Sequence, residues 1–195
     1  LHAPISVAAL EFDKHVLTEA RMARNADEAR SMLAASVDHP ELVAMVVPAS
    51  FSMWADRAIV RVLGAGARAA GGIGRLLAVR VEWDGGAGDD PGEHWRWQRL
   101  YSGSNTMALG ILVEAMARWL GVAEWVSAHT ANFAPRKPAL DGRLVPVDVP
   151  DHVAVLASYP GGVTASIEMS TVTMRGRGIH ATFHGTEGVL HADFG

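Results

Sequence analysis

The first 70 residues alternate between helical and strand patterns of apolar and polar positions. The spacing of apolar residues predicts helices at about residues 3–12, 25–36 and 52–70. Short apolar runs between them predict a buried strand at residues 15–18 and a second strand at residues 41–49 that Pro48 ends. An order of helix, strand, helix, strand, helix is typical of parallel strands whose faces are covered by helices.

The loop after the first predicted strand carries candidate binding residues. Glu19 follows the strand directly, and ligands of open α/β sheets bind at the carboxyl ends of strands. Arg21 could meet a cofactor phosphate or an acidic substrate, or it could be a solvated loop arginine. Asn25 is the expected N-cap of the next helix, with Glu28 three residues later in a capping-box pattern.

After residue 70 the pattern changes to repeated strands around one apolar helix. A strand is predicted at residues 74–86, then a polar and aromatic loop, then a helix at 105–121 that Gly121 ends. Further strands are predicted at 124–133, 152–159, 163–173, 179–184 and 188–194. The segments YPGGV and HGTEGV are expected hairpin turns whose glycines adopt positive φ. This half is predicted to be an α+β domain, with a mostly antiparallel open-faced sheet covered by a helix.

Composition narrows the classes of protein that fit. About half of the 195 residues are hydrophobic, which supports a packed core. A net charge of −4 gives no basic excess, so neither nucleic acid nor an anionic membrane is a predicted partner. No apolar run reaches the length of about 20 residues that a membrane helix needs, and no signal peptide is evident. Cysteine is absent, which excludes disulfides and thiol chemistry and fits the cytoplasmic location that we expect.

The stretch HWRWQRLYSGSN combines aromatic surface with polar donors. Such a mixture suits a sugar or an acid-bearing ligand, but it also suits a subunit interface or plain packing. Asn105 is in addition the expected cap of the apolar helix. The candidate substrate-binding residues are Trp95, Trp97, Arg99, Tyr101 and Asn105.

Histidines offer one candidate for proton transfer and a weak candidate for metal binding. His94 is the candidate general acid, because imidazole titrates near neutral pH. His180, His184 and His191 fall on two strands of one predicted hairpin and could approach one another. No acid or supporting shell accompanies them, so no metal site is predicted.

Several segments, in order, resemble the Gfo/Idh/MocA family of NAD(P)-dependent oxidoreductases. They are LHAPISVAALEFDKHVLTEARMA, GGIGRLLAVRVEWDGG, ALGILVEAMARWLG and ATFHGTEGVLHADF. The resemblance implies an α/β plus α+β fold. Residues 1–70 would be a partial Rossmann-like segment of the dinucleotide-binding domain, and residues 71–195 a sheet domain for substrate binding and oligomerisation.

The resemblance also implies a reaction. NAD or NADP would exchange a hydride with a sugar-like or related small alcohol or carbonyl substrate. The family's usual Glu-Lys-Pro has its glutamate near the nicotinamide ribose and its lysine assisting proton transfer. Glu19 matches the glutamate, so Glu19 and Arg21 are the expected cofactor-binding residues, whereas Ala20 replaces the lysine. A homodimer or homotetramer is expected, because an open sheet has a face to bury.

Other departures from the family pattern leave a second interpretation open. Many members place an aspartate and a histidine on the apolar helix, where this chain has Ala108 and Leu112. A non-catalytic binding or scaffold homologue that dimerises through the sheet is therefore the alternative to an oxidoreductase. The glycine-rich stretch at residues 64–74 follows a helix and precedes a strand, the reverse of a pyrophosphate-binding turn. We thus expect an inactive fragment that starts after the family's fourth Rossmann strand.

Overall fold

The computed structural model describes residues 2–47, 50–64, 72–85, 92, 94–103, 107–173 and 178–194. Its helices are α1 (His2–Glu11), α2 (Ala26–Asp38), α3 (Ser50–Gly64), α4 (Arg99–Ser102) and α5 (Leu109–Leu120), with 3₁₀ turns η1 (Trp95–Trp97) and η2 (Pro160–Gly162). Its strands are β1 (Val16–Thr18), β2 (Ala44–Val46), β3 (Leu76–Asp84), β4 (Trp125–Ala131), β5 (Arg136–Pro138), β6 (Leu144–Pro146), β7 (His152–Tyr159), β8 (Val163–Ser170), β9 (Gly178–Gly185) and β10 (Val189–Asp193). None of the described helices is long and apolar enough to cross a membrane.

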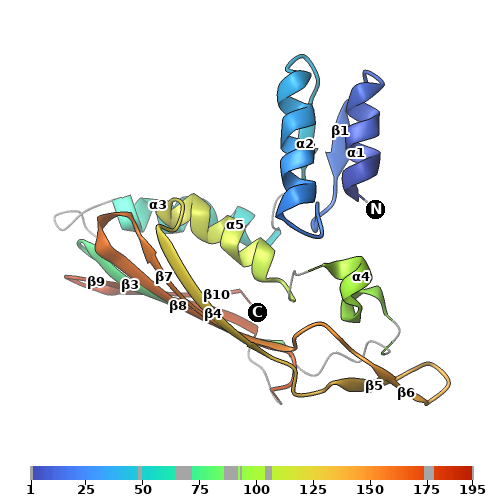
Figure 1. Ribbon diagram of the computed structural model, residues 1–195. Helices are drawn as coiled ribbons and strands as arrows, with labels where there is room; N and C mark the ends of the chain where they lie inside the picture. The colour runs from blue at the N-terminus through green and yellow to red at the C-terminus, as the bar shows by residue number, and fades with distance from the viewer. Residues whose placement is uncertain are drawn as a thin grey trace.

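The elements α1, β1, α2 and β2 form a small N-terminal unit beside the larger sheet (Figure 1). β1 and β2 pair in parallel, as the alternating pattern predicted. Asn25 caps α2, because its side chain accepts a hydrogen bond of 2.9 Å from the Glu28 amide. The predicted capping box is wrong in its second half, since the Glu28 carboxylate accepts from the Arg24 amide instead of the Asn25 amide.

Six strands form the main sheet, in the order β10-β9-β3-β8-β7-β4. β3 and β8 pair in parallel, and every other neighbouring pair is antiparallel. Helices α3 and α5 lie over one face of this sheet (Figure 1). The mostly antiparallel sheet with a covering helix is therefore confirmed, with α3 as a second covering helix.

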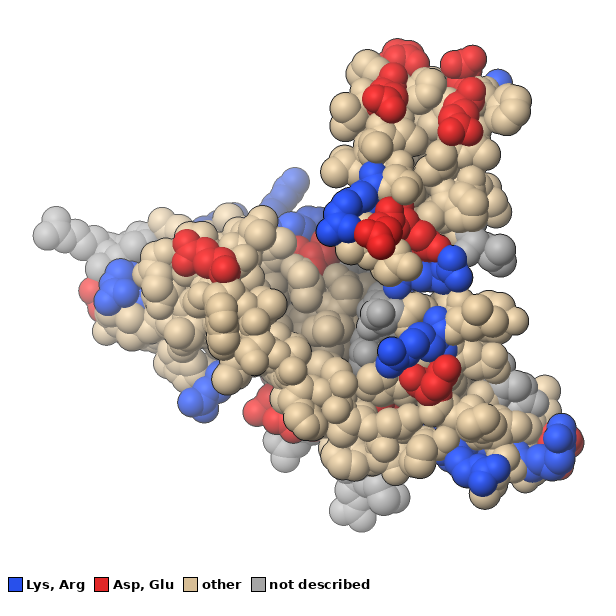
Figure 2. Space-filling view, viewed as in Figure 1, with Lys and Arg blue, Asp and Glu red and all other residues tan. Residues whose placement is uncertain are grey.

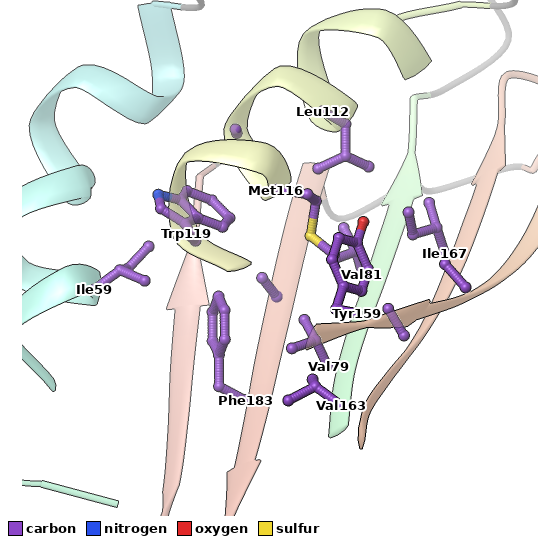
Figure 3. Packing of buried hydrophobic residues seen from close by; sticks show 14 of the residues in the cluster. Ile59, Val79, Val81, Leu112, Met116, Trp119, Tyr159, Val163, Ile167 and Phe183 are labelled. Carbon is purple, nitrogen blue, oxygen red and sulfur yellow. The ribbon is translucent and has the colours of Figure 1, made fainter. Parts of the chain in front are cut away.

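The core lies between these helices and the sheet (Figure 3). Leu112, Met116 and Trp119 project from α5 toward strand residues such as Phe183, and the rings of Trp119 and Phe183 meet edge to face at 5.7 Å. Alternate residues along β8 enter this core, as expected for a strand with one covered face. Each large apolar side chain buried in this way stabilises the fold by about 1.5–3 kcal/mol.

Two local predictions are wrong. The apolar helix begins at Leu109 instead of Asn105. Met107 has a φ of 50°, which an α-helix does not allow, and Ala108 occupies the N-cap position without a side-chain cap. Asn105 itself lies outside the described residues. The loop predicted over residues 86–104 contains η1 and α4 in its described part.

The two predicted glycine turns have different causes. In YPGGV, Gly161 and Gly162 have φ of 79° and 76°, which confirms the prediction. In HGTEGV, neither Gly185 nor Gly188 has a positive φ, so the prediction is wrong there. Gly185 is required by a close approach instead, since a Cβ at this position would lie 1.9 Å from the Ile73 carbonyl oxygen.

Candidate functional site

A pocket of about 650 Å³ lies between the N-terminal unit and the η1–α4 segment. One wall is the loop that follows the carboxyl end of β1, with Ala20, Arg21 and Arg24. The other wall includes Trp95, Tyr101 and Ser102. Because β1 and β2 are parallel, the pocket lies where ligands bind in open α/β sheets.

Long-range contacts hold the two walls together. The Arg24 guanidinium donates a hydrogen bond to the Leu100 carbonyl at 3.2 Å, and the backbones approach closely at Gly103. A Cβ at Gly103 would lie 2.0 Å from the Arg24 carbonyl oxygen, and its φ of 68° also favours glycine. On the other side, His2 Nδ1 lies 3.0 Å from the Arg21 carbonyl oxygen.

The two arginines of the pocket have different electrostatic surroundings. Arg24 forms an ion pair with Glu28, which raises the pKa of Arg24 and lowers that of Glu28. Arg21 donates a hydrogen bond to the Met107 carbonyl, and no described carboxylate lies within ion-pair distance of it. Burial, and secondarily the positive charge of Arg96, lower the pKa of Arg21. Figure 2 shows Lys and Arg side chains gathered where the N-terminal unit meets the rest of the molecule.

Comparison with known proteins identifies the family. The sequence profile of the GFO/IDH/MocA C-terminal domain matches residues 65–191. The chain belongs to the Gfo/Idh/MocA family. The resemblance inferred from the sequence motifs is therefore confirmed.

Relatives of the chain include dehydrogenases of known structure. The chain is 32% identical to levoglucosan dehydrogenase of Pseudarthrobacter phenanthrenivorans, over 97% of this chain and 52% of that protein. An NAD-binding oxidoreductase from Klebsiella pneumoniae superposes with a TM-score of 0.83 at 26% identity, over 100% of this chain and 51% of its own. Levoglucosan dehydrogenase in complex with NADH and L-sorbose superposes with a TM-score of 0.82 at 27% identity, over 100% of this chain and 52% of its own. The chain thus spans about half the length of these relatives.

The structure brings together some of the candidate residues in this Gfo/Idh/MocA chain. Arg21, Trp95 and Tyr101 line the pocket, and the Arg21 guanidinium lies 5.6 Å from the centre of a Trp95 ring. Glu19 is exposed at the end of β1, next to the pocket residue Ala20. The peptide bond between Ala20 and Arg21 is cis.

Other candidate residues lie around the pocket without lining it. Trp97 is buried, with Lys137 Nζ 3.9 Å from the centre of its ring. Arg99 is exposed, and its amide donates to Asp148 at 2.6 Å. His94 Nδ1 accepts from the Arg96 amide at 3.3 Å, and its Nε2 lies 3.4 Å from the Arg96 guanidinium.

Several residues that line the pocket were not predicted from the sequence, among them polar ones. His2, Arg24 and Ser102 all contribute to its walls. Arg24 carries a weak signal, because Glu28 follows four residues later and could pair with it. Ser102 could not have been predicted from the sequence, since its position depends on the contact between the loop after β1 and α4.

The helix positions that carry chemistry in many Gfo/Idh/MocA members serve packing in this chain. Leu112 is buried in the core against the sheet, and Ala108 packs beside that core. Glu114, the ionisable residue nearby on α5, lies 3.6 Å from Arg118. Side chains at 108 and 112 therefore offer no proton donor.

Possible metal ligands converge away from the pocket. Asp13, His39 and Glu41 have ligand atoms within 4.8 Å of one another, near the carboxyl ends of α1 and α2. Of the three histidines considered from the sequence, His180 lies 2.5 Å from Asp193 and His191 lies 3.2 Å from Thr182. These contacts give both imidazoles protein partners, and the carboxylate beside His180 shows that the expectation of no accompanying acid was wrong.

Proposed function

We propose that the pocket is the substrate end of an NAD(P)-dependent oxidoreductase site for a sugar-like alcohol or the corresponding carbonyl compound. The observation that carries this proposal is the meeting of the loop after β1 with the aromatic η1–α4 segment around about 650 Å³ of space. Aromatic walls with a few polar donors suit a polyol. Relatives named as levoglucosan dehydrogenase, one of them in complex with NADH and L-sorbose, support the same substrate class.

The residues of this chain fit the nicotinamide end of the cofactor better than its pyrophosphate. A nicotinamide cofactor bound here would accept or deliver the hydride. Glu19 and Arg21 remain the residues proposed to contact it, from the loop at the carboxyl end of β1. In the described part of the chain, no glycine turn links a strand to the start of a helix, which a pyrophosphate site needs. We therefore propose that this chain alone is inactive.

Proton transfer must come from residues other than those usual in the family. Ala20 has no ionisable group, and Leu112 is buried in the core. We retain His94 as the candidate, because it lies beside the pocket residue Trp95, with ring centres 5.8 Å apart. Imidazole can exchange a proton near neutral pH.

Titration with NADH tests the proposal. Energy transfer from tryptophan to the reduced nicotinamide would be measured in this chain and in one extended to the length of the relatives. We expect saturable binding in the extended chain and loss of part of the signal in Trp95→Phe, since Trp95 lines the pocket. A Trp125→Phe variant is the control, because Trp125 is an exposed residue of the edge strand β4. An extended, folded chain that binds neither NADH nor NADPH would refute the proposal.

A non-catalytic scaffold that dimerises through the sheet is the second candidate function. The face opposite the helices carries Arg80 beside Glu82 and Glu168, which face each other across β3 and β8. A two-fold related copy could bring its Arg80 to these like charges. Leu156, 58% exposed, adds apolar surface at the same face. The same face would serve the homodimer or homotetramer of an enzyme.

Sedimentation tests this interface separately from the pocket. We expect Leu156→Asp to shift the protein toward the monomer, because it places a charge in an apolar contact. Leu140→Asp is the matched control, since Leu140 is 84% exposed outside that sheet face. Identical sedimentation of wild type and Leu156→Asp would refute the interface. Turnover of a polyol by the extended chain would refute a purely non-catalytic role.

A further inference from the structure

Two buried polar groups in the wall of the pocket have no hydrogen-bond partner among the residues that the structure describes. Ser102 is 1% exposed and its Oγ is unpaired. Arg21 Nη1 is also buried and unpaired, although Nη2 of the same guanidinium donates to the Met107 carbonyl. Both residues line the pocket. Buried polar atoms in native proteins are nearly always paired, so unpaired donors beside a pocket favour a ligand atom as their partner.

The positive charge of Arg21 favours an anionic ligand at these donors. Arg24 is already neutralised by Glu28. In the described ranges, the partners of the Arg21 guanidinium are the Met107 carbonyl and the Trp95 ring, both neutral, and the nearby Arg96 adds a like charge. A half-buried cation without a counter-ion is costly, and an anionic ligand would remove that cost.

We propose that Arg21 and Ser102 form an oxyanion subsite, which takes a carboxylate or phosphate group of the ligand. A guanidinium binds such groups through short, charge-assisted hydrogen bonds, and the serine hydroxyl supplies a further donor. Trp95 and Tyr101 flank the subsite and can cover the apolar face of a sugar chain. The inference rests on the proposed function, because it narrows the substrate class of the same pocket from neutral polyols to their acidic or phosphorylated forms.

A role in packing alone does not explain the buried hydroxyl of Ser102. If position 102 served packing alone, alanine would fit and would leave no hydroxyl to satisfy. Arg21 likewise exceeds what packing against Trp95 needs, because one of its terminal nitrogens remains unpaired. The proposed oxyanion is the partner of both groups.

An NMR titration of this 20.7-kDa chain tests the subsite, with the Trp95 indole resonance as a reporter. D-gluconate and sorbitol are the matched probes, since they differ in one terminal carboxylate. We expect gluconate to bind about tenfold more tightly than sorbitol. Arg21→Met should remove this preference, and Ser102→Ala should weaken gluconate binding about threefold to tenfold while leaving sorbitol unchanged. Arg143→Met is the control, because Arg143 is exposed on the β5–β6 hairpin and paired with Asp141.

Competition with inorganic phosphate and NADH identifies the source of the oxyanion. If gluconate shows no preference, but inorganic phosphate and NADH compete and both weaken in Arg21→Met, the anion is a cofactor phosphate and the subsite stands. If no anionic probe depends on Arg21 or Ser102, the inference is overturned. Should Arg21→Met fail to fold, Ser102→Ala and the wild-type preference still decide. NADH binding in the extended chain without any anion preference would refute this inference alone, whereas anion binding without NADH binding would refute the proposed function alone.

Discussion

The N-terminal unit and the main sheet bury their apolar residues to very different extents. In the sheet, residues of β3, β7, β8 and β9 meet α3 and α5 in one continuous core. In the N-terminal unit, the buried apolar side chains are Ala3, Leu10 and Met32, while Leu17 of β1 is 69% exposed. Parallel strands are usually covered on both faces, and β1 and β2 are not, so the prediction of a buried strand at residues 15–18 is wrong.

This difference teaches how the pocket is built. Its α4 wall belongs to the chain that continues into the well-packed α5, whereas its other wall is the loop after β1. Polar contacts, such as that between Arg24 and the Leu100 carbonyl, tie the loop to α4. Hydrogen bonds of this kind each contribute only about 0.5–1.5 kcal/mol to stability. A ligand bound in the pocket would therefore add substantially to the stability of this wall.

The largest expected contrast is in native-state hydrogen exchange. Amides of β3 and β8 should exchange only through global opening, with a free energy of about 5–15 kcal/mol. Amides of α1 and α2 should open at a cost several kcal/mol lower, because the N-terminal unit buries little apolar surface. Mass spectrometry of labelled peptides would measure both, with α5 as an internal reference. Equal protection in the two regions would contradict the comparison.

Truncating one apolar side chain in each region should change the free energy of unfolding by different amounts, and this difference is smaller than the contrast in hydrogen exchange. Phe183 is 0% exposed and contacts Trp119, so Phe183→Ala should lower the free energy of unfolding by about 3–5 kcal/mol. Leu17→Ala, the control in the N-terminal unit, should change it by about 0.5 kcal/mol or less. Urea denaturation monitored by circular dichroism would give both values. A cost for Leu17→Ala as large as that for Phe183→Ala would show that β1 is covered in solution.

The polar contacts between α3 and α5 should contribute less to the free energy of unfolding than the apolar core does. Asp56 accepts a hydrogen bond of 2.7 Å from Trp119 Nε1 and forms an ion pair with Arg118. Asp56→Ala leaves the buried indole N–H unpaired and should cost about 1–3 kcal/mol in urea denaturation. Asp56→Asn keeps an oxygen acceptor and should cost less. If both variants unfold at the wild-type urea concentration, this link adds nothing to the stability of the main sheet and its covering helices.

The sequence was informative where local pattern decides structure. Val163, Ala165, Ile167 and Met169 alternate along β8, and all of them enter the core. The parallel strands, the cap at Asn25 and the end of α5 at Gly121 are likewise set by nearby residues. By contrast, β5 and β6 are three residues long and contain Pro138 and Pro146, so no strand period is visible in them.

The candidate site was predictable only in part, for a similar reason. Arg21, Trp95 and Tyr101 stand out by residue type, and all three line the pocket. The pocket itself depends on Gly103 approaching the Arg24 carbonyl, a contact between distant segments. The local sequence pattern does not predict that contact. The position of Ser102 in the pocket wall could therefore not be predicted either.

The smallest predicted effect tests whether the N-terminal unit opens independently. Asn25→Ala removes the hydrogen bond that the Glu28 amide donates to the Asn25 side chain, and should cost about 1 kcal/mol. Because α2 lies in the weakly packed region, the loss should appear as faster hydrogen exchange in α2, with the exchange of β3 unchanged. Asn25→Asp keeps an acceptor oxygen and should restore the protection. An equal loss of protection in β3 would mean that both regions unfold together, and the N-terminal unit would then draw its stability from the same core as the sheet.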